Sequence, residues 1–189
     1  MQAVANTLAS RVQDIGTMKD MIDVLELLTS QHAEVDELFE QLEADPGDRA
    51  ALFEQLADKL AAHATVEEKV FYPAAMEAQT SDLLHESVEE HLAIKRVLAD
   101  MLDLDPDDED DEDEFDAKLS VLKEQVSHHA HKEEEAKLFP QLRQLMSEDE
   151  RAALGNEVLA MFETLIDSAP RKQVPSEIAE PAPLPSVAG

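Results

Sequence analysis

A histidine followed about one helical turn later by a glutamate occurs twice in this chain, each time shortly before a phenylalanine and a proline. The first pair is His63 with Glu67, and the second is His129 with either Glu133 or Glu134. Residues about four apart lie on the same face of a helix, so each pair brings an imidazole nitrogen and a carboxylate oxygen together. Such ligands bind transition metals, and two helices that carry them can enclose a site for two ions.

The carboxylate of the second pair stays open between two neighbours. Glu133 has the ideal helical spacing from His129, whereas Glu134 takes the place of Glu67 when positions are counted back from the Phe-Pro end of the motif. Beyond His129 the apolar stripe resumes at Leu138, one position late for an unbroken helix. A one-residue insertion such as a π-bulge would reconcile the two halves, and such bulges often lie at functional sites.

Four amphipathic stretches must position these side chains. Apolar residues at helical spacing predict helices from Met18 to a turn at 45–47, from about Asp48 to Pro73, from about Ser81 to Leu102, and from about Phe115 to Leu145. Each stretch places one histidine on its apolar side, and these are His32, His63, His91 and His129. Any one of them alone has an ordinary explanation. Together they predict a shared metal centre, because burying unpaired histidines and carboxylates costs several kcal/mol.

The remaining histidines lie off the apolar sides of their helices. His85, His128 and His131 are therefore expected to be ordinary surface or hydrogen-bonded residues. His131 with Glu135 is a fallback ligand pair if the fourth helix has another register. The single tyrosine, Tyr72, is expected to serve packing.

Composition limits the classes of function. The 189 residues include no cysteine, which excludes disulfides, thiolate metal sites and cysteine nucleophiles. A formal charge of −29 opposes binding to nucleic acid or to anionic lipid surfaces. The sequence shows no signal-peptide pattern and no membrane-spanning apolar run, so we expect a soluble, cytoplasmic protein. Residues 103–114 are almost all acidic and predict a solvated loop, kept for solubility rather than for attracting metal ions.

Breaks in the pattern divide the chain into four parts. Residues 1–17 are predicted to form an arm or short helix, 18–146 a helical bundle, 147–168 a helix packed on that bundle, and 169–189 a Pro-rich disordered tail. Ser147, followed by three acidic residues, has the pattern of a helix N-cap with an acidic first turn. Nothing in the tail identifies a protein partner.

The order His, His-x-x-x-Glu, His and His-Glu on four successive helices, with Glu67-Glu68-x-x-Phe71-Tyr72-Pro73 in the second, resembles the hemerythrin-like domain, also called the HHE cation-binding domain. The likeness covers roughly residues 20–146. It implies an all-α fold, an up-down-up-down antiparallel four-helix bundle, here with an additional C-terminal helix. It also implies two non-haem iron ions in an oxo- or hydroxo-bridged di-iron centre. Carried over residue by residue, the ligands would be His32, His63, His91 and His129, with Glu67 and either Glu133 or Glu134 as bridging carboxylates.

The third helix departs from that family's oxygen carriers, which supply two histidines one turn apart there. Ser87 and Lys95 stand one turn on either side of His91 in this chain. The resemblance therefore implies that the protein binds or senses oxygen or a related small oxidant, nitric oxide or peroxide, and makes reversible oxygen carriage less secure. Alternatives are a di-iron enzyme acting on peroxide or nitric oxide, or an iron storage or delivery protein. A metal-free interaction bundle is disfavoured, because it would leave buried carboxylates unpaired.

Overall fold

The computed structural model describes residues 22–44, 48–78 and 80–185, and within these ranges all regular structure is helical. The predicted N-terminal arm, residues 1–17, lies outside the described residues. None of the described helices is long and apolar enough to cross a membrane.

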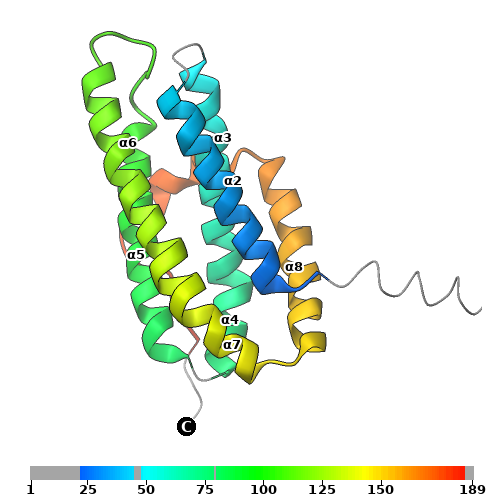
Figure 1. Ribbon diagram of the computed structural model, residues 1–189. Coiled ribbons are helices and arrows are strands. Elements are labelled where there is room, and N and C mark those ends of the chain that lie inside the picture. The colour runs from blue at the N-terminus through cyan, green and yellow to red at the C-terminus, as the bar shows by residue number, and fades with distance from the viewer. Residues whose placement is uncertain (1–21, 45–47, 79, 186–189) are drawn as a thin grey trace, which may run out of the picture.

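The described residues form four long helices, one shorter helix packed beside them and a short 3₁₀ helix (Figure 1). The first is α2 (Val24–Ala44) and the third is α5 (Ser81–Met101). The second and fourth are continuous helices that each contain a π-helical segment. The second consists of α3 (Arg49–Val66), η1 (Glu67–Phe71) and α4 (Tyr72–Glu77). The fourth consists of α6 (Glu112–Ser127), η2 (His128–Leu138) and α7 (Phe139–Leu145).

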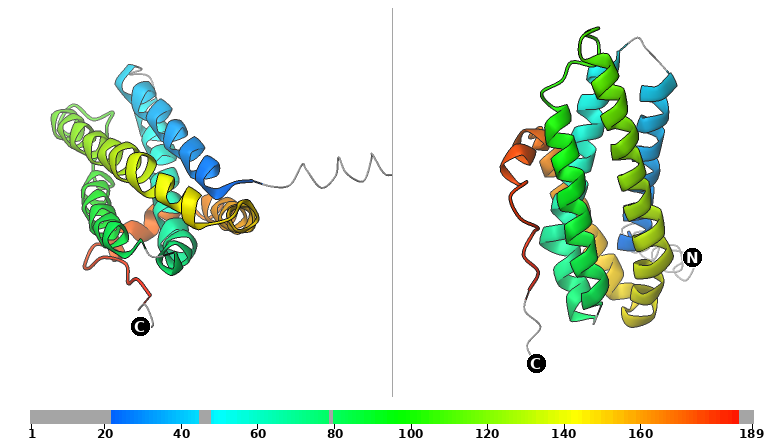
Figure 2. Two further views of the ribbon diagram at one scale, coloured as in Figure 1. Left: turned by 60° about the horizontal axis from the view of Figure 1, so that its bottom comes forward. Right: turned by 90° about the vertical axis from the view of Figure 1, so that its left-hand side faces the viewer.

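The long helices alternate in direction, as an up-down-up-down bundle requires (Figures 1 and 2). The helix α8 (Glu148–Ile166) packs outside this bundle against α2 and α3. It begins with a capping box, in which the Ser147 hydroxyl accepts a hydrogen bond from the backbone N–H of Glu150 and the Glu150 carboxylate accepts one from the backbone N–H of Ser147. The predicted all-α bundle with an additional C-terminal helix is therefore confirmed.

The apolar core is split into two clusters by a polar layer. One cluster includes Phe39, Phe53 and Phe115 and fills the end of the bundle near the α5–α6 loop. The other includes Phe71 and Phe139 and fills the opposite end. The four histidines on the apolar sides of the long helices lie between these clusters, so apolar side chains separate their layer from water at both ends of the bundle.

The acidic stretch is only partly a loop. Residues 102–111 connect α5 to α6, and aspartate carboxylates accept hydrogen bonds from backbone N–H groups of the turn, as Asp105 does from Asp107. The last acids, Glu112 to Glu114, form the first turn of α6, where the helix dipole favours negative charge. The prediction of a loop over 103–114 was therefore wrong for its last three residues.

The Pro-rich tail is ordered rather than disordered from 170 to 185. It forms a short 3₁₀ helix, η3 (Pro170–Ser176), and then runs extended along the side of α5 (Figure 2). Val174 is buried in the core, and Arg171 pairs with Asp58 and Glu54 of α3. These contacts bind the segment to the bundle. Proline restricts the conformations of the unfolded chain, so that less conformational entropy is lost when the segment docks. Composition alone therefore gave the wrong prediction for these residues.

Gly155 is where α8 meets the start of α2. A Cβ at this position would lie 1.8 Å from the backbone oxygen of Ile22, so a larger residue forces the two elements apart. We expect Gly155→Ala to lower the free energy of unfolding by about 1–3 kcal/mol. Without the clash, the higher helix propensity of alanine would stabilise the chain by roughly 1 kcal/mol.

Urea unfolding followed by circular dichroism measures the effect, with Asn156→Ala on the exposed face of the same helix as the control. A stabilised Gly155→Ala variant would contradict the close approach of α8 to α2.

Candidate metal centre

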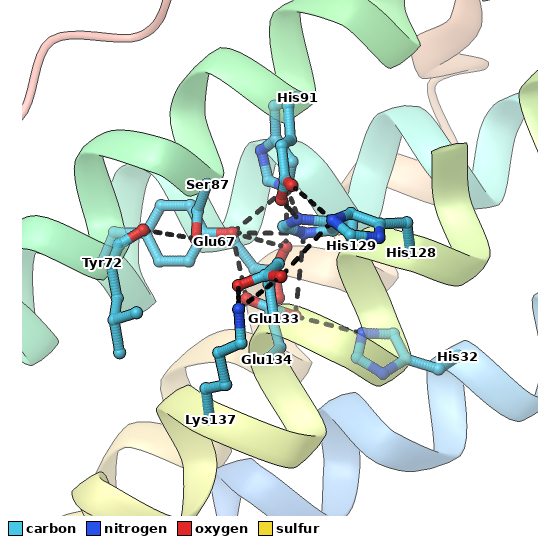
Figure 3. Close-up of polar contacts among 12 residues, drawn as sticks. His32, Glu67, Tyr72, Ser87, His91, His128, His129, Glu133, Glu134 and Lys137 are labelled. Atoms are coloured by element: carbon cyan, nitrogen blue, oxygen red, sulfur yellow. Dashed lines mark hydrogen bonds and ion pairs between the residues drawn. The ribbon is translucent and has the colours of Figure 1, made fainter. Parts of the chain in front are cut away.

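Each long helix contributes one histidine to the polar layer, and the second and fourth helices add a carboxylate each (Figure 3). Two groups of side chains each bring their ligand atoms within 4.8 Å of one another. One group is His32, His63, Glu67 and Glu134, and the other is Glu67, His91 and His129. Glu67 belongs to both groups, so the arrangement can hold two cations with this carboxylate between them.

The structure decides between the two candidate carboxylates of the fourth helix by position. Glu134 has no exposed surface, and its Oε2 lies 3.3 Å from His32 Nε2. Glu133 instead pairs with Lys137 and lies 3.3 Å from His128, outside both core groups. Of the sequence-predicted ligands, the structure therefore brings together all except Glu133.

The π-helical segment η2 explains why the more distant glutamate is the one that faces His129. A π-helix has more residues per turn than an α-helix, so residues five apart share a face. The predicted insertion between His129 and Leu138 is confirmed, and it extends over a whole segment. Both π-helical segments end two residues before a proline, Pro73 or Pro140, whose ring would clash with the carbonyl four residues earlier in a regular helix. The second helix continues past Pro73, which sequence reasoning took as its bend or end.

All four histidines make a hydrogen bond through Nδ1, the ring nitrogen that faces away from the centre. The acceptors are Glu135 for His32 at 2.7 Å, Gln31 for His63 at 2.7 Å, Glu68 for His91 at 3.1 Å and Glu90 for His129 at 2.8 Å. Carboxylate and amide oxygens only accept hydrogen bonds, so each Nδ1 carries a proton and each Nε2 points into the centre. This is the arrangement that orients imidazoles as metal ligands.

The inward Nε2 atoms lie close to one another in pairs. His32 Nε2 lies 3.2 Å from His63 Nε2, and His91 Nε2 lies 2.9 Å from His129 Nε2. Two lone pairs this close repel unless a proton or a cation lies between them. Glu67 Oε1 is buried without a hydrogen bond, a state that costs free energy. Cations would satisfy both needs, so these residues fit a dinuclear metal centre.

Neighbouring carboxylates raise the pKa of two of the four histidines. Burial disfavours the charged form of His32, but hydrogen bonds to Glu134 and Glu135 outweigh it and raise the pKa to about 10. Burial likewise opposes the charge on His91, yet Glu67 and Glu68 raise its pKa to about 9. The pKa of Glu67 is held well below its usual range, since His63 and His91 outweigh the effect of its burial. Metal binding must therefore release protons from His32 and His91.

Tyr72 is a polar member of the centre that sequence reasoning missed. The side chain is fully buried, as expected of a packing residue, but its hydroxyl donates to Glu134 Oε1 at 3.0 Å and lies 3.2 Å from His91 Nε2. Burial and the two carboxylates raise its pKa well above the usual value, so the hydroxyl keeps its proton. The available signal was that a buried tyrosine hydroxyl nearly always finds a polar partner.

The histidines expected to be ordinary lie outside the core groups. His85 is exposed and bonds to the backbone oxygen of Ser81. His131 pairs with Asp36 and Glu135 at the surface, so the fallback pair supports the centre from outside, through the hydrogen bond that His32 donates to Glu135 and the edge-on contact of the His131 and His32 rings. His128 is half exposed, next to Glu90 and Glu133.

The C-terminal segment reaches the back of His91. Lys95 is buried and bonds to Glu68 at 2.8 Å and to Glu177 of the tail at 2.9 Å. Glu68 is the residue that accepts from His91 Nδ1. The docked tail thus adds a carboxylate to the ionic network behind one ligand.

A small cavity of about 30 Å³ adjoins the four histidines. Its other walls are apolar and come from Val35, Leu60, Ala64, Ile94, Val126 and Ala130. A single water molecule needs about 10–15 Å³ of such space, so the cavity holds only a few atoms. A diatomic molecule or a peroxide fits this scale, and a larger organic substrate does not.

Comparison with known proteins agrees with this geometry. The sequence profile of the family described as hemerythrin HHE cation binding domain matches residues 23–142. The chain is similar in structure to a hemerythrin HHE cation binding domain-containing protein from Mycobacterium kansasii, with a TM-score of 0.68 and 24% sequence identity. That likeness covers 81% of this chain and 93% of the other. No curated protein sequence matches the chain.

Proposed function

We propose, because this chain belongs to the hemerythrin HHE cation-binding domain family, that its centre holds two iron ions and binds or senses a small oxidant. The observation that carries the proposal is the set of four imidazoles with Nδ1 bound outward and Nε2 turned inward beside Glu67 and Glu134. Imidazole and carboxylate ligands with open positions suit non-haem iron.

The chain's residues divide naturally between two ions. His32, His63 and Glu134 would hold one, His91 and His129 would hold the other, and Glu67 would serve both. When bound, ferrous ions would supply electrons and open coordination positions to oxygen, nitric oxide or peroxide. The second ion would have fewer protein ligands, because Ser87 and Lys95 stand where a further histidine would be needed.

The protein itself supplies a narrow cavity with apolar walls and, near it, a tyrosine hydroxyl that keeps its proton. The two apolar clusters exclude water, and the cavity of about 30 Å³ limits the ligand to a few atoms. Tyr72 holds a proton within hydrogen-bond reach of Glu134 and His91. A proton donor at this point also favours a second candidate function, turnover of peroxide, since its reduction consumes protons.

Anaerobic reconstitution with ferrous iron tests the proposal. We expect about two irons per chain by metal analysis, and a new charge-transfer absorption band on exposure to oxygen or nitric oxide. Reversal of the band on removing the gas identifies ligand binding, whereas product formed at many molecules per site identifies turnover. A chain that retains little iron after gel filtration would contradict the proposal.

A substitution that fills the cavity should distinguish a ligand-binding function from an iron-storage function. We expect Ala130→Val to retain iron and to bind nitric oxide at least about tenfold more weakly, because the substitution adds two methyl groups in a tight pocket where even one carbon costs about this much. Ala136→Val, at an exposed position of the same π-helical segment, is the matched control. Nitric oxide titration followed by absorption gives both affinities. Equal affinities in the two variants would show that the ligand does not occupy this cavity.

A further inference from the structure

The π-helical segment η2 creates a second histidine–glutamate pair beside the first. His129 and Glu134 face the core, and one residue earlier His128 and Glu133 have the same spacing of five. His128 Nε2 lies 3.3 Å from Glu133 Oε1 (Figure 3). It also lies 3.4 Å from Glu90 Oε1 of α5. One imidazole nitrogen and two carboxylate oxygens thus converge outside the centre, the ligand types that divalent transition metals take.

Glu90 connects this outer triad to the core. Its Oε2 accepts the hydrogen bond from His129 Nδ1 at 2.8 Å, while its Oε1 faces His128. Glu133 is likewise the sequence neighbour of the core residue Glu134. The outer triad, defined as Glu90, His128 and Glu133, therefore stands directly behind the half of the centre that contains His129.

Exposure distinguishes the outer triad from the core. His128 is 56% exposed and Glu90 20%, so water and hydrated ions reach them, whereas Glu133 is 8% exposed. The core ligands are all buried, and Glu67 and Glu134 have no exposed surface. A hydrated cation that reaches the core must first lose water, which partial coordination at the boundary makes easier.

We propose that Glu90, His128 and Glu133 form a third cation site, which captures a divalent transition-metal ion from solvent and passes it to the core. The capture of a cation stands on the outer triad alone. Its delivery inward rests on the proposed function of the core as a metal centre.

Lys137 competes with a cation for the carboxylate of Glu133. Its Nζ lies 2.6 Å from Glu133 Oε1 and also bonds to the other carboxylate oxygen. The ammonium group neutralises Glu133 while no metal is bound. Because this side chain is half exposed and flexible, it can swing into solvent when a divalent ion arrives. The site therefore predicts opposite effects for removal of His128 and removal of the lysine charge.

Cobalt(II) is a suitable probe, since it resists oxidation by air at such ligands and its visible spectrum reports coordination. We expect the metal-free full-length protein to bind about two Co²⁺ tightly and about one more weakly. His128→Ala should lose the weak ion, keep the tight ones, and fill the core about tenfold more slowly in stopped-flow mixing, because the local cation concentration falls. Lys137→Gln should bind the weak ion about fivefold more tightly, the size of one surface ion pair.

Two matched controls separate the site from general effects. His85→Ala removes an exposed histidine of α5, and Lys132→Gln removes an exposed lysine of η2 with the same change of net charge. His128→Ala behaving like His85→Ala in both the weak binding and the filling rate would overturn the proposal. Loss of the weak ion with an unchanged filling rate would overturn the delivery step. Failure of the core as a metal centre is a distinct result, in which the tight ions are missing and only the ion sensitive to His128 remains.

Discussion

Replacing Glu67 with glutamine empties both halves of the centre. Glu67 is the one side chain that belongs to both groups of converging ligands, and it is fully buried between His63 and His91. Glutamine keeps the size of the side chain but removes the negative charge that offsets two cations. We expect bound iron to fall from about two ions per chain to well below one, because carboxylate is the harder and stronger oxygen ligand.

Metal analysis after anaerobic loading and gel filtration measures this loss. Glu68→Gln is the matched control, since Glu68 is the next residue and bonds to the outward Nδ1 of His91 and to Lys95 rather than to an inward atom. Changes to such supporting residues typically weaken metal binding by about 10- to 100-fold, so Glu68→Gln should affect one ion and spare the other. Far-ultraviolet circular dichroism must show that both variants remain helical. A Glu67→Gln variant that still carries two irons would contradict a shared carboxylate.

The four helices and their histidines could be predicted because they follow a fixed period. On α2, for example, Leu28, His32 and Val35 lie on one face of a regular helix, so the sequence places the histidine between two core residues. The same argument holds for the other long helices. The convergence of their histidines then follows from the cost of burying unpaired imidazoles separately.

The supporting acceptors could not be predicted, because each comes from another element or from a helix of altered register. A pattern nevertheless appears once the structure is known: the acceptors are the sequence neighbours of core residues, Gln31 beside His32, Glu68 beside Glu67, Glu90 beside His91 and Glu135 beside Glu134. A neighbour on a helix is rotated by about 100°, so it points along the seam toward the next helix. There it meets the Nδ1 atom of a different histidine.

The docked tail escaped prediction for a different reason. Proline-rich composition predicts disorder when no apolar or charged group can dock, but Val174 and Arg171 supply both kinds of contact. Their partners lie on α3, more than a hundred positions earlier in the chain, as the bond from Arg171 to Asp58 shows. No local pattern contains information about such a pairing.

Replacing Glu134 with glutamine should remove one ion, and replacing Glu133 in the same way should remove neither core ion. The two positions are neighbours on η2, and both substitutions change the net charge equally. Glu134 belongs to the group with His32 and His63, whereas Glu133 belongs to the outer triad. We therefore expect iron to fall from about two ions per chain to about one in Glu134→Gln, and to stay at about two in Glu133→Gln.

Metal analysis of the two variants side by side also tests the register of the fourth helix. A regular α-helix from His129 would place Glu133 inward and reverse the result, since residues four apart would then share the face. A larger loss of iron in Glu133→Gln would therefore contradict the π-helical segment. We expect Glu67→Gln to lose both core ions, Glu134→Gln to lose one and Glu133→Gln to lose none. This order arises only if the Glu67 carboxylate is shared by both ions and the Glu134 carboxylate binds one of them.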